Sequence, residues 1–291
     1  MIPQAFEYHV ATSVREAATL LAEFGGDGKV LAGGHSLLPM MKLRLATPGH
    51  LVDISRIPDL AYVREEDGKI YVGALTTHFQ IESSELLRAR CPLLPETAAE
   101  IGDVQVRNRG TIGGSLAHSD PAADWPAAIL ALDAEIRAVS PRGERWIPAA
   151  DFFVDILTTA LEPDEILTAV RMPPLPERAG DAYVKLRQPA SGFAIAGAAV
   201  RVVLDEGGSV QRAAVAVTGV ASKIYRAAGV EFALPGKRPD ARRVADAAAH
   251  AAERVEANDD LYASAAYRAH LARVCTERAL LAAAERAAVG R

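Results

Sequence analysis

Two short glycine-rich stretches contain the residue types best suited to bind phosphate groups. The first, AGGHS, covers residues 32–36, and the second, GTIGGS, covers residues 110–115. Glycine lets backbone N–H groups approach an oxyanion closely, and the neighbouring Ser and Thr hydroxyls add further donors. Two such stretches could hold a pyrophosphate bridge from both sides. Either one alone could equally be an ordinary tight turn, because glycine pairs often mark turns.

The common nucleotide-binding and cysteine motifs are absent from the sequence. Neither glycine stretch fits G-x-G-x-x-G or G-x-x-x-x-G-K-[ST], so a Rossmann dinucleotide site and a P-loop have no support. Cys91 and Cys275 are far apart, which argues against a disulfide framework and against an iron–sulfur cluster with its four thiolates. No pairing of a nucleophile with a base suggests hydrolysis. We therefore expect no catalytic side chain and no metal site in this chain.

The first glycine stretch is expected to follow a helix and a strand. Thr12 or Ser13 can cap a helix through Glu16, as in a capping box. The glycines at residues 25–26 would end this helix, and the pattern of residues 29–32 predicts the strand. The elements expected next are an apolar segment at residues 37–45, a strand at residues 51–54, and two strands around a turn at residues 67–68.

The second glycine stretch is expected to lie in a loop-rich region. Residues 79–102 have a helical pattern that Pro92 and Pro95 interrupt. Residues 104–124 are punctuated by glycine and polar side chains, which is typical of loops. The elements predicted after this region are an apolar helix at residues 125–132 and a strand at residues 134–139.

Three prolines among residues 173–176 indicate a domain boundary, because they continue neither a helix nor a central strand. Beyond them we predict an antiparallel sheet with a hairpin turn at residues 205–208; its strands cover residues 183–187, 195–204 and 210–217. From Asp240 the chain is alanine-rich, with 19 Ala among the last 51 residues, which predicts two closing helices. One stripe of the second helix carries Tyr267, Leu271, Val274, Arg278 and Leu281.

The composition is that of an ordinary soluble protein. The chain has 291 residues, half of them apolar, and a net charge of −5. This mild acidity gives no indication of nucleic-acid binding, which usually needs clustered Lys and Arg. The sequence contains no run of about 18 apolar residues, the length needed to span a membrane. Residues 1–7 show neither the basic nor the apolar part of a signal peptide. We therefore expect a cytoplasmic protein without a membrane span.

The two glycine stretches belong to longer motifs that resemble those of a known family. AGGHSLLP at residues 32–39 resembles the first flavin-binding signature of the medium, FAD-binding subunits of the xanthine dehydrogenase and aerobic carbon monoxide dehydrogenase family. VRNRGTIGGS at residues 106–115, followed by DPAAD at residues 120–124, is similar to the second signature. The resemblance extends to residues 183–187 and 260–268, and so covers essentially the whole chain.

This resemblance implies an α+β fold and two domains. The first, residues 1–175, would be an FAD-binding domain of the vanillyl-alcohol-oxidase or PCMH type, with subdomains at about residues 1–56 and 57–175. The second, residues 176–291, would be a small α+β C-terminal domain of the carbon monoxide dehydrogenase flavoprotein type.

The function that the resemblance implies is electron transfer through non-covalently bound FAD in a molybdenum hydroxylase. The chain would be an oxidoreductase subunit that passes electrons from two [2Fe–2S] clusters to an external acceptor. The clusters would lie on a small partner subunit and the Mo-pterin cofactor on a large one, in a dimer of heterotrimers. Two distant cysteines agree with this division, because this chain cannot itself hold the clusters.

The resemblance also implies which residues bind the FAD. The residues expected on one side of the pyrophosphate are Ala32, Gly33, Gly34, His35, Ser36 and Leu37, and those on the other side are Thr111, Gly113, Gly114 and Ser115. Asp124 would accept hydrogen bonds from sugar or ribityl hydroxyls, or else be the N-cap of the helix that begins at Trp125. Lys185 matches a flavin-contacting lysine, or else is a solvated lysine at the end of a strand.

Two further residues are expected at the flavin ring. Ile101 would pack against the ring or belong to the core. Phe193 would shield the ring, although Gly192 stands before it where related chains tend to have Asp.

Four side chains near the two motifs have open roles. His35 is expected to form hydrogen bonds, and His118 to pack or to cap a helix. Arg107 and Arg109 could neutralise phosphate or pair with Asp103 or Asp124.

Two other classes of function remain as alternatives. A self-sufficient flavin oxidoreductase of the same fold, such as an enolpyruvyl-sugar reductase, would need a proton donor and substrate-binding arginines, which the C-terminal half does not show as a cluster. A non-enzymatic nucleotide-binding or scaffold protein would carry no flavin. If the chain is a subunit, the likeliest sources of apolar partner contact are the helices after Asp240 and Met40, Met41, Leu43 and Leu45.

Overall fold

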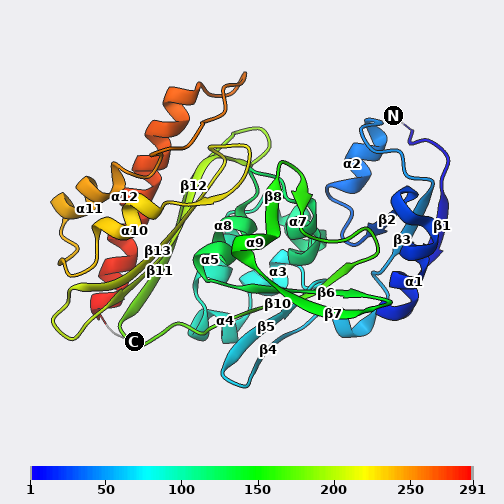
Figure 1. The fold of residues 1–291 in the computed structure, drawn as a ribbon, viewed down its shortest axis with the longest axis horizontal. Coiled ribbons are helices and arrows are strands. Elements are labelled where there is room, and N and C mark those ends of the chain that lie inside the picture. Colours follow the sequence, from blue (N-terminus) through cyan, green and yellow to red (C-terminus); the bar gives the residue numbers. More distant parts are fainter. Residues whose placement is uncertain (1, 290–291) are drawn as a thin grey trace.

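The computed structural model describes residues 2–289 and contains three main sheets that follow one another along the molecule (Figure 1). The N-terminal sheet has the order β1-β3-β2, with both outer strands parallel to β3. Its elements are β1 (Glu7–Val10), α1 (Val14–Phe24), a short 3-10 helix (Gly25–Asp27), β2 (Gly28–Leu31), α2 (Leu37–Lys42) and β3 (His50–Asp53).

Helix α1 begins and ends where the sequence predicts. The Ser13 hydroxyl accepts a hydrogen bond from the Glu16 N–H, and the Glu16 carboxylate accepts one from the Thr12 N–H at 2.8 Å. Gly25 ends the helix with φ +55°, a conformation that favours glycine. The buried face of α1 packs on Val52 of β3. The first glycine stretch therefore follows β2 on a firmly packed unit.

The central sheet is antiparallel and has the order β4-β5-β10-β6-β7. Its strands are β4 (Val63–Glu66), β5 (Lys69–Gly73), β6 (Glu135–Ser140), β7 (Gly143–Pro148) and β10 (Ile166–Met172). The predicted turn at residues 67–68 is confirmed. The other elements of this domain are a 3-10 helix (Pro58–Leu60), α3 (His78–Glu82), α4 (Glu85–Arg90), α5 (Leu93–Ala99), α6 (Val104–Arg109), α7 (Ile112–His118), α8 (Asp124–Ala131), α9 (Ala149–Phe152), β8 (Phe153–Asp155) and β9 (Thr158–Thr159).

Two sequence-based expectations for this domain were wrong. Residues 104–124 form two short helices rather than mainly loop, because each helix has its own cap. The Asp103 carboxylate accepts from two N–H groups at the start of α6, and the Thr111 hydroxyl accepts from Gly114 N–H at the start of α7. Pro95 does not interrupt a helix, since it lies in the first turn of α5, where an N–H group has no intrahelical partner.

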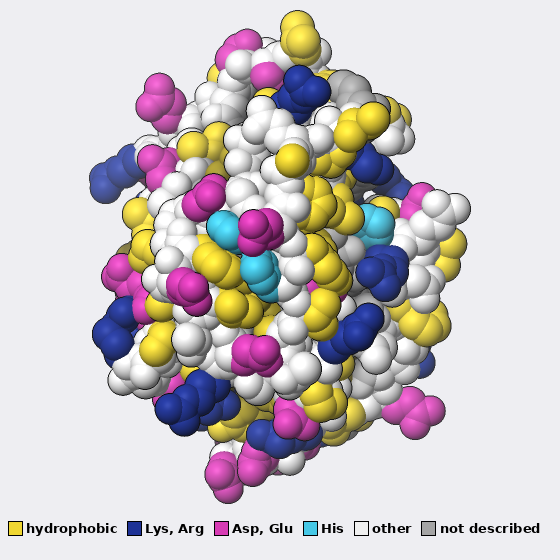
Figure 2. Space-filling model, turned by 90° about the vertical axis from the view of Figure 1, so that its right-hand side faces the viewer, with side chains coloured by type: hydrophobic (Ala, Val, Ile, Leu, Met, Phe, Trp, Pro, Cys, Tyr) yellow, Lys and Arg dark blue, Asp and Glu magenta, His cyan; other side chains and the backbone are white. Residues whose placement is uncertain are grey.

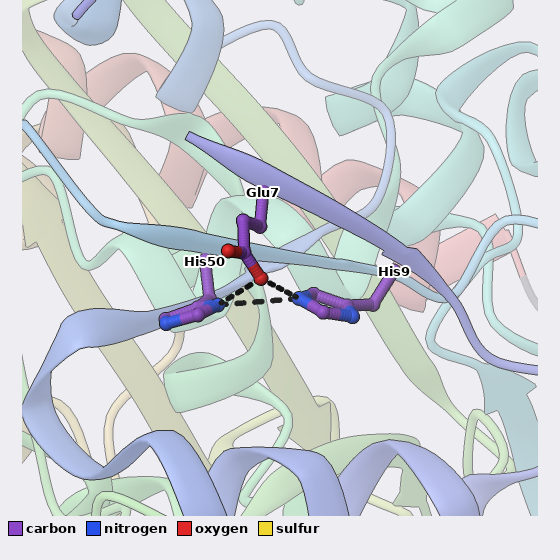
Figure 3. A group of neighbouring side chains, drawn as sticks. All are labelled: Glu7, His9 and His50. Carbon is purple, nitrogen blue, oxygen red and sulfur yellow. Dashed lines mark hydrogen bonds and ion pairs between the residues drawn. The ribbon is translucent and has the colours of Figure 1, made fainter. Parts of the chain in front are cut away.

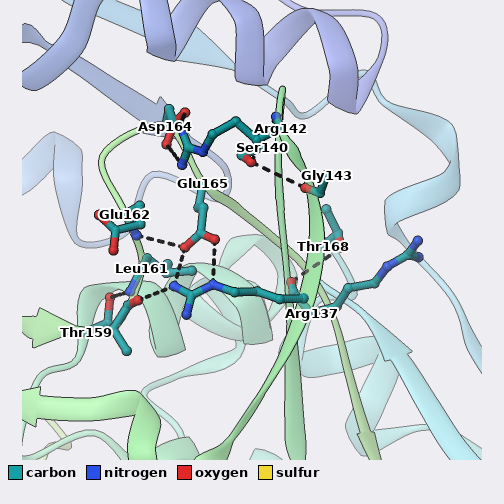
Figure 4. A network of polar contacts seen from close by, with 12 residues as sticks. Arg137, Ser140, Arg142, Gly143, Thr159, Leu161, Glu162, Asp164, Glu165 and Thr168 are labelled. Carbon is teal, nitrogen blue, oxygen red and sulfur yellow. Dashed lines mark hydrogen bonds and ion pairs between the residues drawn. The ribbon is translucent and has the colours of Figure 1, made fainter.

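Ion pairs fix the segment before β10 to the β6–β7 hairpin. Arg142 pairs with Asp164 (Figure 4), and Arg145 pairs with Glu165 at 2.7 Å. The Arg145 guanidinium also donates to the carbonyl of Ala160. These contacts hold the chain as it enters the central strand of the sheet.

The C-terminal sheet confirms the predicted antiparallel strands and hairpin. Its order is β11-β12-β13-β14, formed by β11 (Ala179–Arg187), β12 (Ala194–Leu204), β13 (Val210–Thr218) and β14 (Tyr225–Arg226). Helices α10 (Ala228–Ala233), α11 (Ala241–Ala248) and α12 (Ala265–Val289) follow. One face of the sheet carries α12, and the other packs against α8 of the central domain (Figure 1).

The predicted alanine-rich helices are present, but the buried stripe of α12 differs from the predicted one. Of the five residues on the predicted stripe only Leu271 is buried, while Tyr267 is 45% exposed. The buried face consists mostly of small residues, and they let the helix lie close to the sheet: a Cβ on Gly180 would overlap the carbonyl oxygen of Ala283. Among residues 2–289, no helix is both long and apolar enough to cross a bilayer.

Candidate functional site

The two glycine stretches lie against each other, although some 75 positions separate them in the sequence. A Cβ on Gly33 would overlap the carbonyl oxygen of Arg109, just before the second stretch. A Cβ on Gly114 would lie 3.8 Å from the Cβ of Ala32. The N-terminal sheet and α7 therefore bring both candidate phosphate-binding segments to one place.

A cavity of about 300 Å³ opens beside the contact between the two stretches. Ala32 and Gly33 line it from the first stretch, and Thr111 lines it from the second, together with Arg109 just before that stretch. Arg109 is exposed and forms no ion pair with any residue from 2 to 289, so the predicted pairing with Asp103 or Asp124 is wrong for it. Its charge remains available to an anion in the cavity.

The glycines of the two stretches have different structural roles. Gly113 allows α7 to pack against the residue that follows β5, because a Cβ there would lie 2.6 Å from the Cβ of Ala74. Gly34 has φ +79°, a conformation that L side chains rarely adopt. Gly114 is less constrained, since an added Cβ would meet the Thr111 hydroxyl oxygen at 2.9 Å and the Ala32 Cβ at 3.8 Å, but no backbone atom outside its own helix within 4 Å. A larger residue there would require only the Thr111 side chain to shift, and Ser115 follows it in the same turn of α7.

Asp124 and Lys185 form a buried ion pair between the two domains. Lys185 Nζ lies 2.9 Å from one Asp124 carboxylate oxygen and 3.0 Å from the other, and donates to the Gly192 carbonyl at 2.8 Å. The Tyr183 hydroxyl donates to the same carboxylate. The lysine side chain has no exposed area and that of Asp124 only 6%.

This pair excludes both structural alternatives considered for its members. Lys185 is not solvated, and Asp124 is not a helix cap, because Ala123 occupies the cap position and Asp124 is the first residue inside α8. Burial raises the pKa of the Asp124 carboxyl, while the Lys185 ammonium and the Tyr183 hydroxyl oppose that change. Tyr183 and Lys185 are two residues apart on β11 and so share one face, a signal that sequence reasoning missed.

Ile101 and Phe193 lie on neighbouring segments. Ile101 is half-buried and packs against the central core. A Cβ on Gly192 would touch the Cα of Gly102 at 3.4 Å, so the loop that carries Phe193 passes beside the residue after Ile101. Phe193 is 44% exposed and lines a second cavity of about 290 Å³. The segments that carry the two side chains are therefore neighbours.

Comparison with known proteins then decides the family. Residues 4–175 match the family described as "FAD binding domain in molybdopterin dehydrogenase". The chain belongs to this family. Residues 181–283 of the chain match a second family, described as "CO dehydrogenase flavoprotein C-terminal domain". The family resemblance inferred from the two motifs is thereby confirmed.

Curated relatives match this flavoprotein from end to end. It is 44% identical to the carbon monoxide dehydrogenase medium chain of Hydrogenophaga pseudoflava, with 99% of this chain and 100% of that one covered. It is 41% identical to the 6-hydroxypseudooxynicotine dehydrogenase complex subunit alpha of Paenarthrobacter nicotinovorans, with 99% and 97% covered. A solved structure of carbon monoxide dehydrogenase from Hydrogenophaga pseudoflava superimposes with a TM-score of 0.95 at 45% identity, covering 98% and 99% of the two chains. The predicted fold class is confirmed.

The remaining polar side chains around the flavoprotein's two motifs have mainly structural partners. Arg107 pairs with Glu82 at 2.8 Å and donates to the Ile101 carbonyl at 3.1 Å, so its predicted pairing with Asp103 or Asp124 is wrong. His118 ends α7 half-buried, and burial lowers its pKa, which agrees with a packed side chain. His35 is exposed, and within residues 2–289 no hydrogen bond of its imidazole is found.

Sequence reasoning missed His78, which lies beneath the second stretch. The Trp125 Nε1–H donates to His78 Nδ1 at 3.0 Å, and a Cβ on Gly110 would lie 2.6 Å from His78 Nε2. Burial lowers the pKa of His78 to about 4, and the nearby His35 and Arg107 act in the same direction. Forty-seven positions separate the two rings, so no local pattern reveals this pair.

We expect His78 to make the protein less stable as the pH falls from about 6.5 to about 4. Its folded-state pKa lies below the ordinary value, so the unfolded chain binds more protons in this range. The group then removes up to about 3 kcal/mol of the free energy of unfolding across the window. His78→Gln retains an acceptor for Trp125 and should show a flatter pH dependence in urea unfolding. The exposed His250→Gln is the control, and equal slopes in wild type and His78→Gln would contradict the prediction.

Proposed function

We propose that this chain is the FAD-binding electron-transfer subunit of a molybdenum hydroxylase, an oxidoreductase subunit that passes electrons from [2Fe–2S] clusters of a partner through FAD to an external acceptor. The contact between the two glycine stretches beside a cavity that holds an unpaired arginine carries the proposal. Family membership and 44% identity to a carbon monoxide dehydrogenase medium chain support it.

The residues around the cavity fit the pyrophosphate of FAD. Arg109 and the Thr111 hydroxyl line the cavity and could donate to the pyrophosphate oxygens, with the backbone N–H groups of the first stretch as further candidate donors. The N–H groups of Gly113 and Gly114 already donate to the Ala74 carbonyl and the Thr111 hydroxyl, so the second stretch would contribute side chains rather than these groups. The bound FAD would accept and release the electrons. The side chains proposed to hold it non-covalently are those predicted from the motifs: Ala32, Gly33, Gly34, His35, Ser36, Leu37, Ile101, Thr111, Gly113, Gly114, Ser115, Asp124, Lys185 and Phe193.

The buried ion pair would position the flavin rather than react with it. Tyr183 and Lys185 hold the Asp124 carboxylate at the junction of α8 and β11. Lys185 also fixes the Gly192 carbonyl, and with it the loop that carries Phe193. These contacts would keep Phe193 and Ile101 on one side of the ring and leave the chemistry to the cofactor.

We also propose the partners that the resemblance implies, namely a large Mo-pterin subunit and a small [2Fe–2S] subunit in a dimer of heterotrimers. Both cysteines of this chain are buried thiols, so neither is placed to ligate a cluster. Of the apolar residues proposed for partner contact, Leu43 and Leu45 are 53% and 72% exposed, whereas Met41 is buried and belongs to the core. Domain boundaries near residues 56 and 175 remain part of the proposal.

A cytoplasmic location is the last part of this proposal. Cys91 and Cys275 are both free, and thiols persist in a reducing compartment. Both are also fully or nearly fully buried, at 0% and 3% exposure, so oxidants would reach them slowly.

The test is purification of the native protein from its own organism, followed by mass measurement of the whole assembly. We expect two companion chains, one large and one small and cysteine-rich. Carbon monoxide and quinoline, the substrates named for similar structures, serve as first probes of flavin reduction. Any substrate should reduce the flavin only within the complex. A lone chain whose flavin a substrate reduces directly would instead support the self-sufficient oxidoreductase.

A further inference from the structure

Three potential metal ligands, Glu7, His9 and His50, lie together on one face of the N-terminal sheet (Figure 3). The parallel pairing of β1 with β3 sets Glu7 opposite His50. His9 is two residues after Glu7 on β1, and alternate residues of a strand point to the same face. The ligand atoms of all three side chains lie within 4.8 Å of one another. The cluster comes from strand register, so sequence spacing gives no sign of it.

The distances within the cluster are close to those of a metal coordination sphere. His9 Nε2 and His50 Nδ1 are 3.2 Å apart, and one Glu7 carboxylate oxygen lies 3.8 Å and 3.6 Å from them. Ligand atoms about 2.0–2.1 Å from a tetrahedral Zn²⁺ ion stand roughly 3.3 Å from one another. Figure 3 shows one nitrogen of each ring directed at the same carboxylate oxygen. Small movements of the Glu7 side chain would complete the geometry.

Phe24, at the end of α1, holds both imidazole rings in place. Its ring stacks on His50 with centroids 4.0 Å apart and an angle of 8°, and its centroid is 4.7 Å from that of His9. The two histidine side chains are 27% and 26% exposed, while Glu7 is 74% exposed. The rings are thus preorganised and the carboxylate is free to adjust. Figure 2, which views the molecule from this side, shows two neighbouring imidazoles beside acidic groups at the open surface.

We propose that Glu7, His9 and His50 bind a divalent transition-metal ion, with Zn²⁺ the best fit. Two imidazole nitrogens and one carboxylate oxygen are ligands that Zn²⁺ prefers, and the exposed side leaves a fourth position for water. None of the three residues lines the cavity between the glycine stretches. The ion would cross-link β1 to the middle strand of its sheet. Binding to the folded form alone would raise the melting temperature as Zn²⁺ is added.

The competing explanation is a hydrogen bond between two neutral imidazoles, for which 3.2 Å is also a suitable distance. Calorimetric titration separates the two. The full chain with its FAD is treated with a chelator, dialysed, and titrated with Zn²⁺; a parallel titration with Co²⁺ gives the visible spectrum of a four-coordinate ion. We expect one equivalent of each metal to bind.

Matched variants locate the bound ion. His9→Gln and His50→Gln should each weaken Zn²⁺ binding at least about tenfold, the lower bound for changes around metal sites. His250→Gln is the control, because His250 is a similar surface histidine that pairs only with Glu253, three residues further along. It should bind Zn²⁺ as the wild type does.

Glu7→Gln removes the proposed carboxylate ligand and gives an independent check of Zn²⁺ binding at this site. This side chain is mostly exposed, so its loss should leave the fold intact. Retained flavin shows that each variant is folded. The proposal is overturned if flavin-loaded wild type binds neither Zn²⁺ nor Co²⁺, or if one equivalent still binds unchanged to His9→Gln and His50→Gln. Because flavin content is measured separately, a failure of the metal site is distinguishable from a failure of the proposed FAD function.

Discussion

Gly114→Val is expected to give folded, soluble protein that purifies without FAD. An added Cβ meets the Thr111 hydroxyl oxygen at 2.9 Å and the Ala32 Cβ at 3.8 Å, so the fold should tolerate the side chain after a small shift of Thr111. The same side chain would enter the space between the two glycine stretches, since its Cβ would lie 3.8 Å from that of Ala32. We expect the affinity for FAD to fall at least about 100-fold, equivalent to about 2.7 kcal/mol.

The measurement is the amount of flavin that acid precipitation releases from equal amounts of wild type and variant. Gly26→Val is the control, because an added Cβ there meets nothing within 4 Å and lies outside both glycine stretches. Circular dichroism verifies that both variants are folded. A folded Gly114→Val protein that retains one FAD per chain would contradict the pyrophosphate site.

Gly33 and Gly113 should behave differently from Gly114, although all three glycines belong to the same motifs. A Cβ on Gly33 overlaps the backbone of Arg109, and one on Gly113 presses on Ala74 at 2.6 Å. Substitution at either position would separate the two segments that form the cavity. Loss of FAD there would therefore report a damaged fold, which is why the more tolerant Gly114 is the informative position.

The sequence could predict features that depend on local chemistry. The cap of α1 at Ser13, the glycine at its end, and the hairpin before β13 are all set by neighbouring residues. Long motifs also predicted the family correctly. The same local reasoning was wrong for residues 104–124, where it gave glycine more weight than the caps at Asp103 and Thr111.

Features that depend on distant contacts could not be predicted. Strand β10 inserts between β5 and β6, so its two neighbours come from far earlier in the chain. His78 meets Trp125 across 47 positions, and Asp124 meets Lys185 across 61. Burial decides whether each of these side chains is solvated or paired inside the protein, and burial is a property of the assembled fold. A solvated Lys185 was therefore a reasonable expectation from the strand alone, and it was wrong.

Lys185→Met is expected to lower the free energy of unfolding by about 3–5 kcal/mol, because it leaves the Asp124 carboxylate buried without its counter-charge. The double variant Asp124→Asn/Lys185→Met should recover much of this loss, since no unpaired charge then remains. Urea unfolding of the FAD-free protein measures both effects. Arg243→Met is the control: it breaks an exposed pair with Asp240 and should cost less than about 1 kcal/mol.

The same variants show whether Lys185 contributes to FAD binding beyond its pairing with Asp124. If the lysine acts only through Asp124, the double variant should bind FAD nearly as tightly as wild type once it is folded, because no unpaired carboxylate remains buried. If Lys185 contacts the flavin directly, or positions the Phe193 loop through the Gly192 carbonyl, FAD binding should stay weak in the double variant even though stability has recovered. A single variant as stable as wild type would show that the carboxylate does not depend on this ammonium, and would remove the physical basis for assigning Lys185 to the site.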